Sequence, residues 1–397
     1  MTKFDRFIYN KEMDEKQLAL FKLCLAKDIG IARLENLLSV FETAENVLKS
    51  SKRELLSVEQ IGEKTADSII SVSKSDAAQK EFEIAQRNKI QILLYTDAAY
   101  PEILKNYPDS PPLLYVKGSL LKEDFNSISI VGTRKPTHYG KTATEAFAAY
   151  FAQKNITIVS GLARGVDCIA HRAALNNNSR TIAVLGNGIL VNYPPENAKL
   201  QAEISQKGAL ISEFPITFPP DKRNFPKRNR IIAALSKATL ITEAALPSGT
   251  LITANICAGY GKDVFAVPGN VYGEFSQGTN YLIKNGAFPA LSPREVYEQI
   301  FGGQTFERQS FAEQTFAPQN CGRQNFSEQS KRCPQIENRA ENEVFKLISE
   351  YENGTGIDLI SQKLSLAISD IAAILLKLEM DGLIKTLPGQ VYVKRRD

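Results

Sequence analysis

The chain has 397 residues, and at roughly 150 residues per domain this length predicts two or three domains. With 43% hydrophobic and 23% charged residues, and no apolar run near the roughly 18 residues of a membrane span, we expect a soluble protein without a membrane association. The 48 basic and 44 acidic residues nearly balance at a net charge of +4, so any nucleic-acid-binding signal must be local.

Residues 1–80 are predicted to form a helical domain. The opening MTKFDRFIYNKEMDEK lacks the apolar core of a signal peptide, so we expect a cytoplasmic location. Apolar residues recur at three- and four-residue spacing over residues 14–75, which is typical of helices. The segment VEQIGEKTA resembles the turn of a helix-hairpin-helix module, where Gly62 would open the second helix toward a DNA phosphate. A protein contact is an equal alternative for this SAM-like or helix-hairpin-helix-like domain.

Residues 81–301 are predicted to form one α/β domain. Residues 89–117 read as a strand, a proline-rich turn and a second strand, which extend it. Between residues 126 and 300, helical patterns alternate with the short apolar runs SISIV, ITIVS, TIAVL, ALIS, ATLIT and VFAV. Continuous apolar strands are buried on both faces, so this pattern predicts an extended Rossmann-like, doubly wound, mostly parallel sheet. Ligands of such sheets bind beyond the carboxyl ends of the strands.

Two predicted strands end in glycine-containing turns that suit an anion. The first continues into GTRKPTHYG, where Gly132 lets a phosphate approach the backbone and Arg134 can pair with it, although an ordinary turn is equally compatible. The second ends in SGLARGVD, which begins at Ser160 and Gly161. Asp167 and His171 then share one helix face; an acid/base pair is conceivable there, but a structural role is favoured.

The densest basic cluster is DKRNFPKRNR, residues 221–230, which we place in the loop before an apolar helix. Five basic side chains around one aromatic are typical of single-stranded DNA binding, with cations on phosphates and the ring against a base. A solvated charged surface is the alternative. The glycine turn GNG at residues 186–188 starts a GxGxxG but has Val191 in place of the last glycine, so it fails as a dinucleotide motif.

Metal and disulfide chemistry find little support. The five cysteines are scattered, with no CxxC pair, so we expect reduced thiols and neither a zinc site nor a disulfide framework. His138 and His171 are the only histidines. We therefore expect no metal and no cofactor.

Two further segments complete the chain. Residues 302–335 are rich in glutamine, repeat a QxF unit and lack large aliphatic residues, so they are predicted to form a disordered linker. Residues 336–397 show three helical patterns followed by LIKTL and VYVK, which predict a winged-helix domain.

Eight ordered motifs together resemble the family of DNA-processing protein A (DprA, also called Smf). They are GTRKPTHYG from Gly132, SGLARGVDCIAH from Ser160, AVLGNGILVNYP from Ala183, SEFP from Ser212, FPKRNRIIAALS from Phe225, EAALPSGTLITA from Glu243, AVPGN from Ala266 and SQGTNYLIKNGA from Ser276. The resemblance spans roughly residues 90–300, and the helical and winged-helix segments agree with the family's architecture.

The resemblance implies a protein without enzymatic activity. Members of this family bind and protect single-stranded DNA and load the RecA recombinase onto it during natural transformation, and they form homodimers through the Rossmann-like domain. By motif position, the implied DNA-binding residues are Arg134, Ser160, Gly161, Lys222, Phe225, Lys227, Arg228 and Asn229, while Arg164 is a weaker candidate. Among them, Arg134 and Lys227 would hold phosphates and Phe225 would meet a base.

Two alternatives remain. The fold also resembles nucleotide phosphoribohydrolases of the lysine-decarboxylase-like (LOG) group, whose PGGxGTxxE signature corresponds to LPSGTLIT here. That stretch lacks the double glycine and has Thr253 in place of the catalytic glutamate. A winged-helix regulator with a ligand-sensing Rossmann-like domain is the other, although its recognition helix, residues 369–380, carries only Lys377 as a basic residue.

Overall fold

The computed structural model describes residues 13–302 and, nearer the C-terminus, residues 339–351, 355–364, 371, 374–375, 378–379, 383–387 and 391–394. The chain divides into two compact units, residues 1–309 and 310–397, which are described separately. The linker predicted over residues 302–335 lies outside the described residues except for Gly302.

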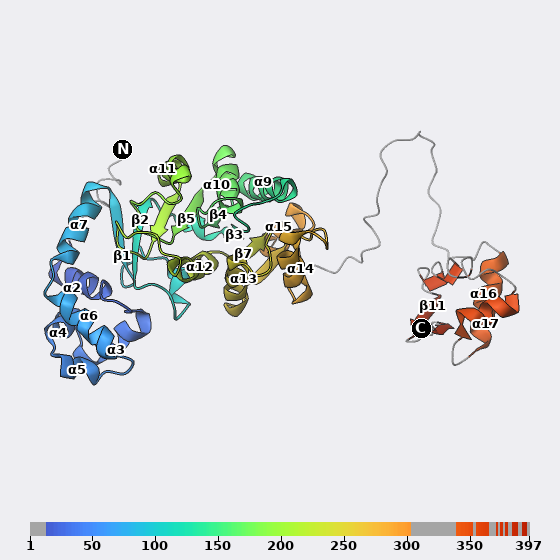
Figure 1. Cartoon of the computed structure of the whole chain (residues 1–397), viewed down its shortest axis with the longest axis horizontal. Helices are drawn as coiled ribbons and strands as arrows, with labels where there is room; N and C mark the ends of the chain where they lie inside the picture. The colour runs from blue at the N-terminus through green and yellow to red at the C-terminus, as the bar shows by residue number, and fades with distance from the viewer. Residues whose placement is uncertain are drawn as a thin grey trace. The chain divides into compact units, whose positions relative to one another are not determined.

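The first unit begins with a cluster of short helices (Figure 1). They are α2 (Glu15–Cys24), α3 (Ile31–Phe41), α4 (Ala44–Lys49), α5 (Lys52–Leu56), α6 (Glu63–Ser73) and α7 (Ala77–Arg87). Two similar turns precede α3 and α6. Asp28 and Gln60 have positive φ angles of 63° and 65°, and each is followed two residues later by the glycine that caps the next helix, Gly30 or Gly62. The turn predicted around Gly62 is therefore present, and its pattern occurs twice.

A nine-stranded sheet follows, in the order β1-β2-β6-β5-β4-β3-β7-β8-β9. Its strands are β1 (Ile90–Leu94), β2 (Leu113–Gly118), β3 (Ser127–Val131), β4 (Thr157–Ser160), β5 (Thr181–Leu185), β6 (Ala209–Ser212), β7 (Ala238–Ile241), β8 (Asp263–Ala266) and β9 (Phe288–Pro289). The neighbours from β6 to β9 are all parallel, whereas β2 pairs antiparallel with both β1 and β6. Strands β4 to β6 lie on one side of β3 and β7 to β9 on the other. The predicted doubly wound, mostly parallel sheet is confirmed.

Helices cover both faces of this sheet (Figure 1). The helical elements are α8 (Glu102–Lys105), η1 (Lys122–Phe125), α9 (His138–Gln153), α10 (Val166–Asn176), η2 (Pro195–Asn197), α11 (Ala198–Lys207), α12 (Asn224–Leu235), α13 (Gly249–Gly259), η3 (Glu274–Ser276), α14 (Gln277–Lys284) and α15 (Pro293–Phe301). Alternate residues of one strand enter different cores: Ile130 packs with α9 and α10, and its neighbour Val131 packs with α12 and α13. Such burial on both faces explains the continuous apolar runs in the sequence.

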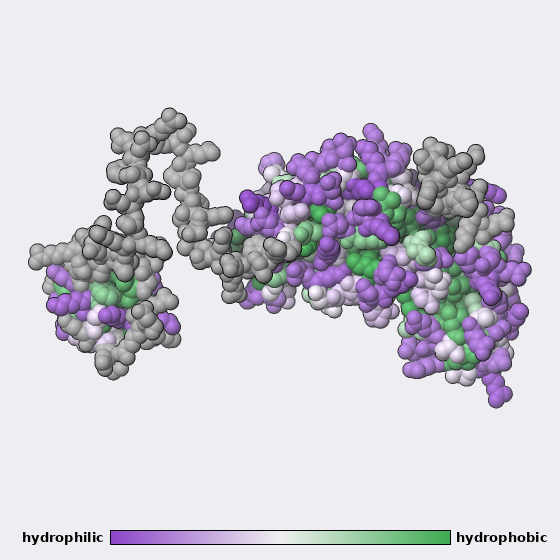
Figure 2. Space-filling view, turned by 180° about the vertical axis from the view of Figure 1, so that it is seen from behind, coloured by the Kyte–Doolittle hydropathy of each residue, from purple (hydrophilic) through white to green (hydrophobic). Residues whose placement is uncertain are grey.

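The surface of this unit is mainly polar. Hydrophilic side chains cover most of the face in Figure 2, and apolar residues appear there in scattered patches. No helix in the described part of the chain is long and apolar enough to cross a membrane.

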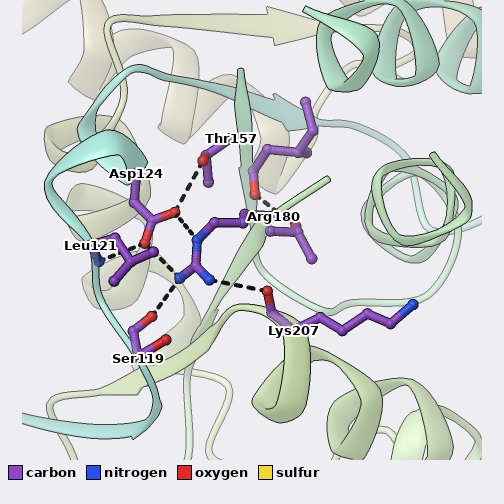
Figure 3. A network of polar contacts seen from close by, with 8 residues as sticks. Ser119, Leu121, Asp124, Thr157, Arg180 and Lys207 are labelled. Carbon is purple, nitrogen blue, oxygen red and sulfur yellow. Dashed lines mark hydrogen bonds and ion pairs between the residues drawn. The ribbon is translucent and has the colours of Figure 1, made fainter. Parts of the chain in front are cut away.

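A buried ion pair fixes the amino ends of the central strands (Figure 3). The Asp124 carboxylate, fully buried in η1, accepts hydrogen bonds from Arg180 Nε at 2.6 Å and Nη2 at 2.8 Å. It also accepts from the Thr157 hydroxyl at 3.1 Å and the Leu121 amide at 2.8 Å. Arg180 further donates to the Ser119 and Lys207 carbonyls, so one guanidinium joins the segments leading into β3 and β5 to the end of α11.

The second unit contains α16 (Arg339–Glu350), β10 (Thr355–Gly356), α17 (Ile357–Leu364), β11 (Ile384–Leu387) and β12 (Val391–Lys394). Its strands form an antiparallel sheet in the order β10-β12-β11. Its core includes Val344, Ile348 and Ile360. Helices followed by a strand pair match the predicted winged helix. Most of the predicted recognition helix, including Lys377, lies outside the described residues.

Candidate nucleic-acid interface

The candidate site lies where the carboxyl ends of β3, β4 and β5 face the start of α12. The strand order reverses at β3, because β4 to β6 are added on one side of it and β7 to β9 on the other. In a parallel sheet, such a point leaves a crevice in which ligands bind. Helix α12 begins at Asn224, so Phe225, Lys227 and Arg228 lie on its first two turns. The expectation that this basic cluster forms a loop is therefore wrong for residues 224–230, and only residues 221–223 precede the helix. Pro226 suits the first turn of a helix. Backbone N–H groups in this turn have no acceptor within the helix, so a proline, which has no N–H, loses no hydrogen bond there.

A cavity of about 590 Å³ opens at these strand ends. Its lining includes Gly132, Thr133, Arg134 and Lys135 after β3, Ala163 and Asp167 near α10, Lys222, Phe225, Pro226, Arg228, Asn229 and Ile232 on or before α12, and Ser248, Gly249, Thr250 and Thr253 at α13. The structure thus brings Arg134, Lys222, Phe225, Arg228 and Asn229 of the predicted set to one cavity. Lys227 is exposed on the same helix but does not line it.

Phe225 is the aromatic centre of this site. Its half-buried ring stacks on Tyr193, with ring centroids 5.7 Å apart and an interplanar angle of 30°. The guanidinium carbons of Arg134 and Arg228 lie 5.6 and 5.9 Å from the ring centroid. A Cβ at Gly186 would come within 2.7 Å of the Phe225 ring, so the glycine after β5 makes room for it.

Three cations of the predicted set are exposed and have no acidic partner. Arg134, Lys222 and Lys227 form no ion pair with any residue in the described ranges. Nearby, Arg223 pairs with Asp221, and this hydrogen-bonded pair lowers the pKa of Asp221 to about 2. The unpaired charges are therefore available to an anion.

Arg164 is placed differently from these three cations. Its guanidinium pairs with Glu196, so its charge already has an acidic partner in the free protein.

Three predicted residues are buried and hold the cavity in shape. The Arg228 guanidinium donates to the Gly161 carbonyl at 2.7 Å and to the Val184 carbonyl, and burial lowers its pKa to about 10. A Cβ at Gly161 would collide with that guanidinium. The Ser160 hydroxyl donates to the Ile130 carbonyl at 2.6 Å. Ser160, Gly161 and Arg228 thus join β3, β4, β5 and α12.

The Asp167 and His171 pair is part of the fold. The Asp167 carboxylate accepts from the amides of Gly161 at 3.1 Å and Ala163 at 3.3 Å, which fixes the turn after β4. His171 Nδ1 lies 2.7 Å from the Thr181 hydroxyl, and burial, with the charge of Arg228 adding to it, lowers the pKa of His171 to about 3. The favoured structural interpretation agrees with these contacts.

The turn after β3 is fixed by Glu243, whose contacts there were not predicted from the sequence. The buried Glu243 carboxylate after β7 accepts from the Thr137 amide at 2.8 Å and the Thr137 hydroxyl at 2.5 Å, at the cap of α9. Tyr193 was missed as a contact of the site, and Ser248 had been considered only as part of a polar, glycine-rich strand end; glycine or proline beside each marked these segments as turns.

Three family models match parts of the chain. Residues 91–301 match the family model of DNA recombination-mediator protein A, residues 328–390 match the DprA winged helix domain, and residues 22–74 match a SAM-like helix-hairpin-helix tandem. The chain is 34% identical over 388 residues to Protein Smf of Synechocystis sp., covering 93% of this chain and 96% of that protein. It is 40% identical over 200 residues to DNA processing protein DprA of Streptococcus pneumoniae, covering 50% and 71%.

A solved structure is similar as well. The X-ray structure of DNA processing protein A from Streptococcus pneumoniae aligns with a TM-score of 0.61 and 30% sequence identity, covering 73% of this chain and 99% of that chain. The sequence and structural likenesses therefore extend beyond the sheet that holds the cavity.

Proposed function

The chain belongs to the family of DNA recombination-mediator protein A, and we propose that its Rossmann-like domain binds single-stranded DNA at the carboxyl ends of β3, β4 and β5. One observation carries this proposal: Arg134 and Lys222, which form no ion pair with any described residue, line one cavity together with Phe225, and the Arg134 guanidinium lies 5.6 Å from the centroid of that ring. The exposed Lys227 extends from the same helix as Phe225. Cations along a backbone and an aromatic under a base are the two elements of single-strand recognition.

Binding of DNA would replace the contact between Arg134 and Phe225 that is present in the free protein. An exposed cation–π contact such as that of Arg134 with Phe225 contributes about 0.5–1 kcal/mol. Stacking of a base on an aromatic contributes about 1–3 kcal/mol. The exchange is therefore favourable: Arg134 turns to a phosphate, with Lys222 and Lys227 on neighbouring phosphates, and the base takes its place on the ring.

The position of Phe225 favours a single strand over a duplex. Its ring is half-buried between Tyr193 and two guanidinium groups, so only a base that has left its stack can lie against it. Bases within a duplex are paired and stacked, and their extrusion costs a few kcal/mol. Asn229 on the cavity wall supplies an amide for a base or sugar.

We assign the remaining predicted residues a positioning role. Arg228 and Ser160 are buried and use their polar atoms on backbone carbonyls, while Gly161 leaves the space that the Arg228 guanidinium fills. They hold α12 against the strand ends, which sets the position of Phe225 and Lys227. No catalytic step is included in this proposal.

At the level of the cell, we propose that the protein protects incoming single strands and loads the RecA recombinase onto them during natural transformation, as a homodimer in the cytoplasm. Family membership and the DNA processing proteins among the relatives support this role. The proposed division is residues 1–80, 81–301 and 336–397 as the helical, DNA-binding and winged-helix domains, with residues 302–335 as linker.

A charge-removal experiment tests the site. Lys227→Ala should weaken binding to fluorescent oligo-dT and reduce the slope of log K against log salt by about 0.7, the value for one lost phosphate contact on a single strand. Lys199→Ala removes an exposed lysine on α11 and serves as the matched control. Equal slopes for both variants and the wild type would overturn the assignment.

A further inference from the structure

The amino end of α13 faces the same cavity and has unused hydrogen-bonding capacity. Ser248 precedes this 11-residue helix with extended backbone angles, φ −145° and ψ 153°, but its side chain does not cap the helix. Its hydroxyl oxygen is buried and has no hydrogen-bond partner among the described residues. A serine at this position ordinarily accepts from an amide of the first turn, so the hydroxyl and the first amides of α13 are left without their usual partners.

The lining of this cavity carries positive charge. Ser248, Gly249 and Thr250 line the cavity together with Arg134 and Lys222, which form no ion pair with any of the described residues. A helix amino end adds about half a positive charge and outward-pointing amides. The cavity therefore concentrates positive potential between α13 and the turn after β3.

The carboxylate in the lining does not cancel this potential. Asp167 lies on the wall, but its carboxylate accepts from the Gly161 and Ala163 amides and is buried. Burial raises the pKa of Asp167, and the charge of Arg228 and the two amides oppose this rise. The charge of Asp167 is thus balanced from within the fold.

We propose that Ser248, Gly249 and Thr250 form a second phosphate subsite, which binds a nucleotide phosphate adjacent to the base on Phe225. This inference rests on the proposed function and deepens it. The first amides of α13 donate to the phosphate oxygens, and the Ser248 hydroxyl donates a further hydrogen bond. Because backbone groups supply most of these contacts, the site recognises the phosphate without reading the base.

A glycine at the first position of α13 allows a direct test in the full-length protein. A Cβ at Gly249 meets nothing within 4 Å, so a side chain fits there. Gly249→Asp places a carboxylate where the phosphate binds, and an acidic residue in the first turn favours the helix, so folding is maintained. Gly249→Asn has the same shape without the charge. Gly259→Asp makes the same change at the other end of α13, where a Cβ also meets nothing within 4 Å.

The expected result is a loss that depends on both charge and position. Gly249→Asp should bind oligo-dT roughly tenfold more weakly than Gly249→Asn, in line with the loss of a charge-assisted contact. Gly259→Asp should stay within about twofold of the wild type. Binding of Gly249→Asp within twofold of both other variants would overturn the subsite.

Two oligonucleotides identify the source of the phosphate. If the subsite takes a strand end, wild-type protein prefers 5′-phosphorylated oligo-dT to the 5′-hydroxyl form, and Gly249→Asp abolishes that preference. If it takes an internal phosphodiester, both forms bind equally and both are weakened by Gly249→Asp. Should wild-type protein bind no oligo-dT, the proposed function itself fails; should Lys227→Ala weaken binding while Gly249→Asp does not, only the subsite fails.

Discussion

Removal of the Arg180 side chain should strongly destabilise the Rossmann-like domain without affecting DNA binding. Asp124 is fully buried and its carboxylate has four donors, two of them from Arg180 (Figure 3). Arg180→Met leaves this carboxylate with only the Thr157 hydroxyl and the Leu121 amide, and it removes the donors to two carbonyls. An uncompensated buried charge costs about 3–5 kcal/mol.

The size of the effect follows from the partial exposure of the arginine. The Arg180 side chain is 26% exposed, so part of its charge is already solvated and the expected cost is near 3 kcal/mol. For a domain of this size each kcal/mol shifts the midpoint of thermal unfolding by about 2–4 °C, which predicts a decrease on the order of 10 °C. Circular dichroism on heating measures it.

A matched variant separates a buried pair from an exposed one. Arg294 pairs with Glu298 on the surface of α15, so Arg294→Met should change the midpoint little. Oligo-dT binding by Arg180→Met should equal that of the wild type below its unfolding transition, because the network lies at the opposite ends of the strands. A midpoint no lower than that of Arg294→Met would refute the reasoning.

Three further predictions concern the cavity and its support. Phe225→Ala should weaken oligo-dT binding by about 1–3 kcal/mol, or roughly 5- to 150-fold, as one stacked base is lost, and unchanged anisotropy titrations would count against the base contact. Gly161→Ala should displace Arg228 and destabilise the domain by about 1–3 kcal/mol in urea unfolding, with weaker DNA binding, whereas wild-type behaviour would show that the guanidinium can relax. His171 has a folded-state pKa of about 3, below the unfolded value near 6.5, so stability is fully present above pH 6.5 and decreases as the pH falls toward 3. Urea unfolding at pH 7.5 and 5.5 should reveal a loss of about 1 kcal/mol that is absent in His171→Asn, and an equal loss in both proteins would assign the effect to other groups.

The strands and their order of appearance were predictable because the chemistry is local. Ser127–Val131 and Thr181–Leu185 are buried along their whole length, and their sequences show the continuous apolar runs that two-sided burial requires. The turns after β3 and β4 were predictable for a similar reason, since glycines beside Arg134 and Ser160 mark a close approach of backbone. These features depend on neighbours in sequence.

Which basic residues are exposed and which are buried could not be predicted, because this depends on partners that are distant in sequence. Lys227 and Arg228 are adjacent in sequence, yet one is exposed and the other donates to carbonyls of two other strand ends. The start of α12 was misplaced because no side chain caps it; Pro226 was the available signal. Glu243 and Ser248 lie in polar strand ends that the sequence marks, but their roles have no local signal. Glu243 acts through a contact more than 100 residues away, and Ser248 has a hydroxyl without a partner among the described residues.

The most direct test of the central claim is a salt titration of the purified full-length protein against fluorescent oligo-dT and a duplex of the same length, with Lys227→Ala beside the wild type. We expect tighter binding to the single strand than to the duplex and a shallower salt slope for Lys227→Ala. Equal binding to both forms of DNA, or the absence of binding to either, would contradict it. In the latter case, an assay for cleavage of nucleoside monophosphates would test the phosphoribohydrolase alternative.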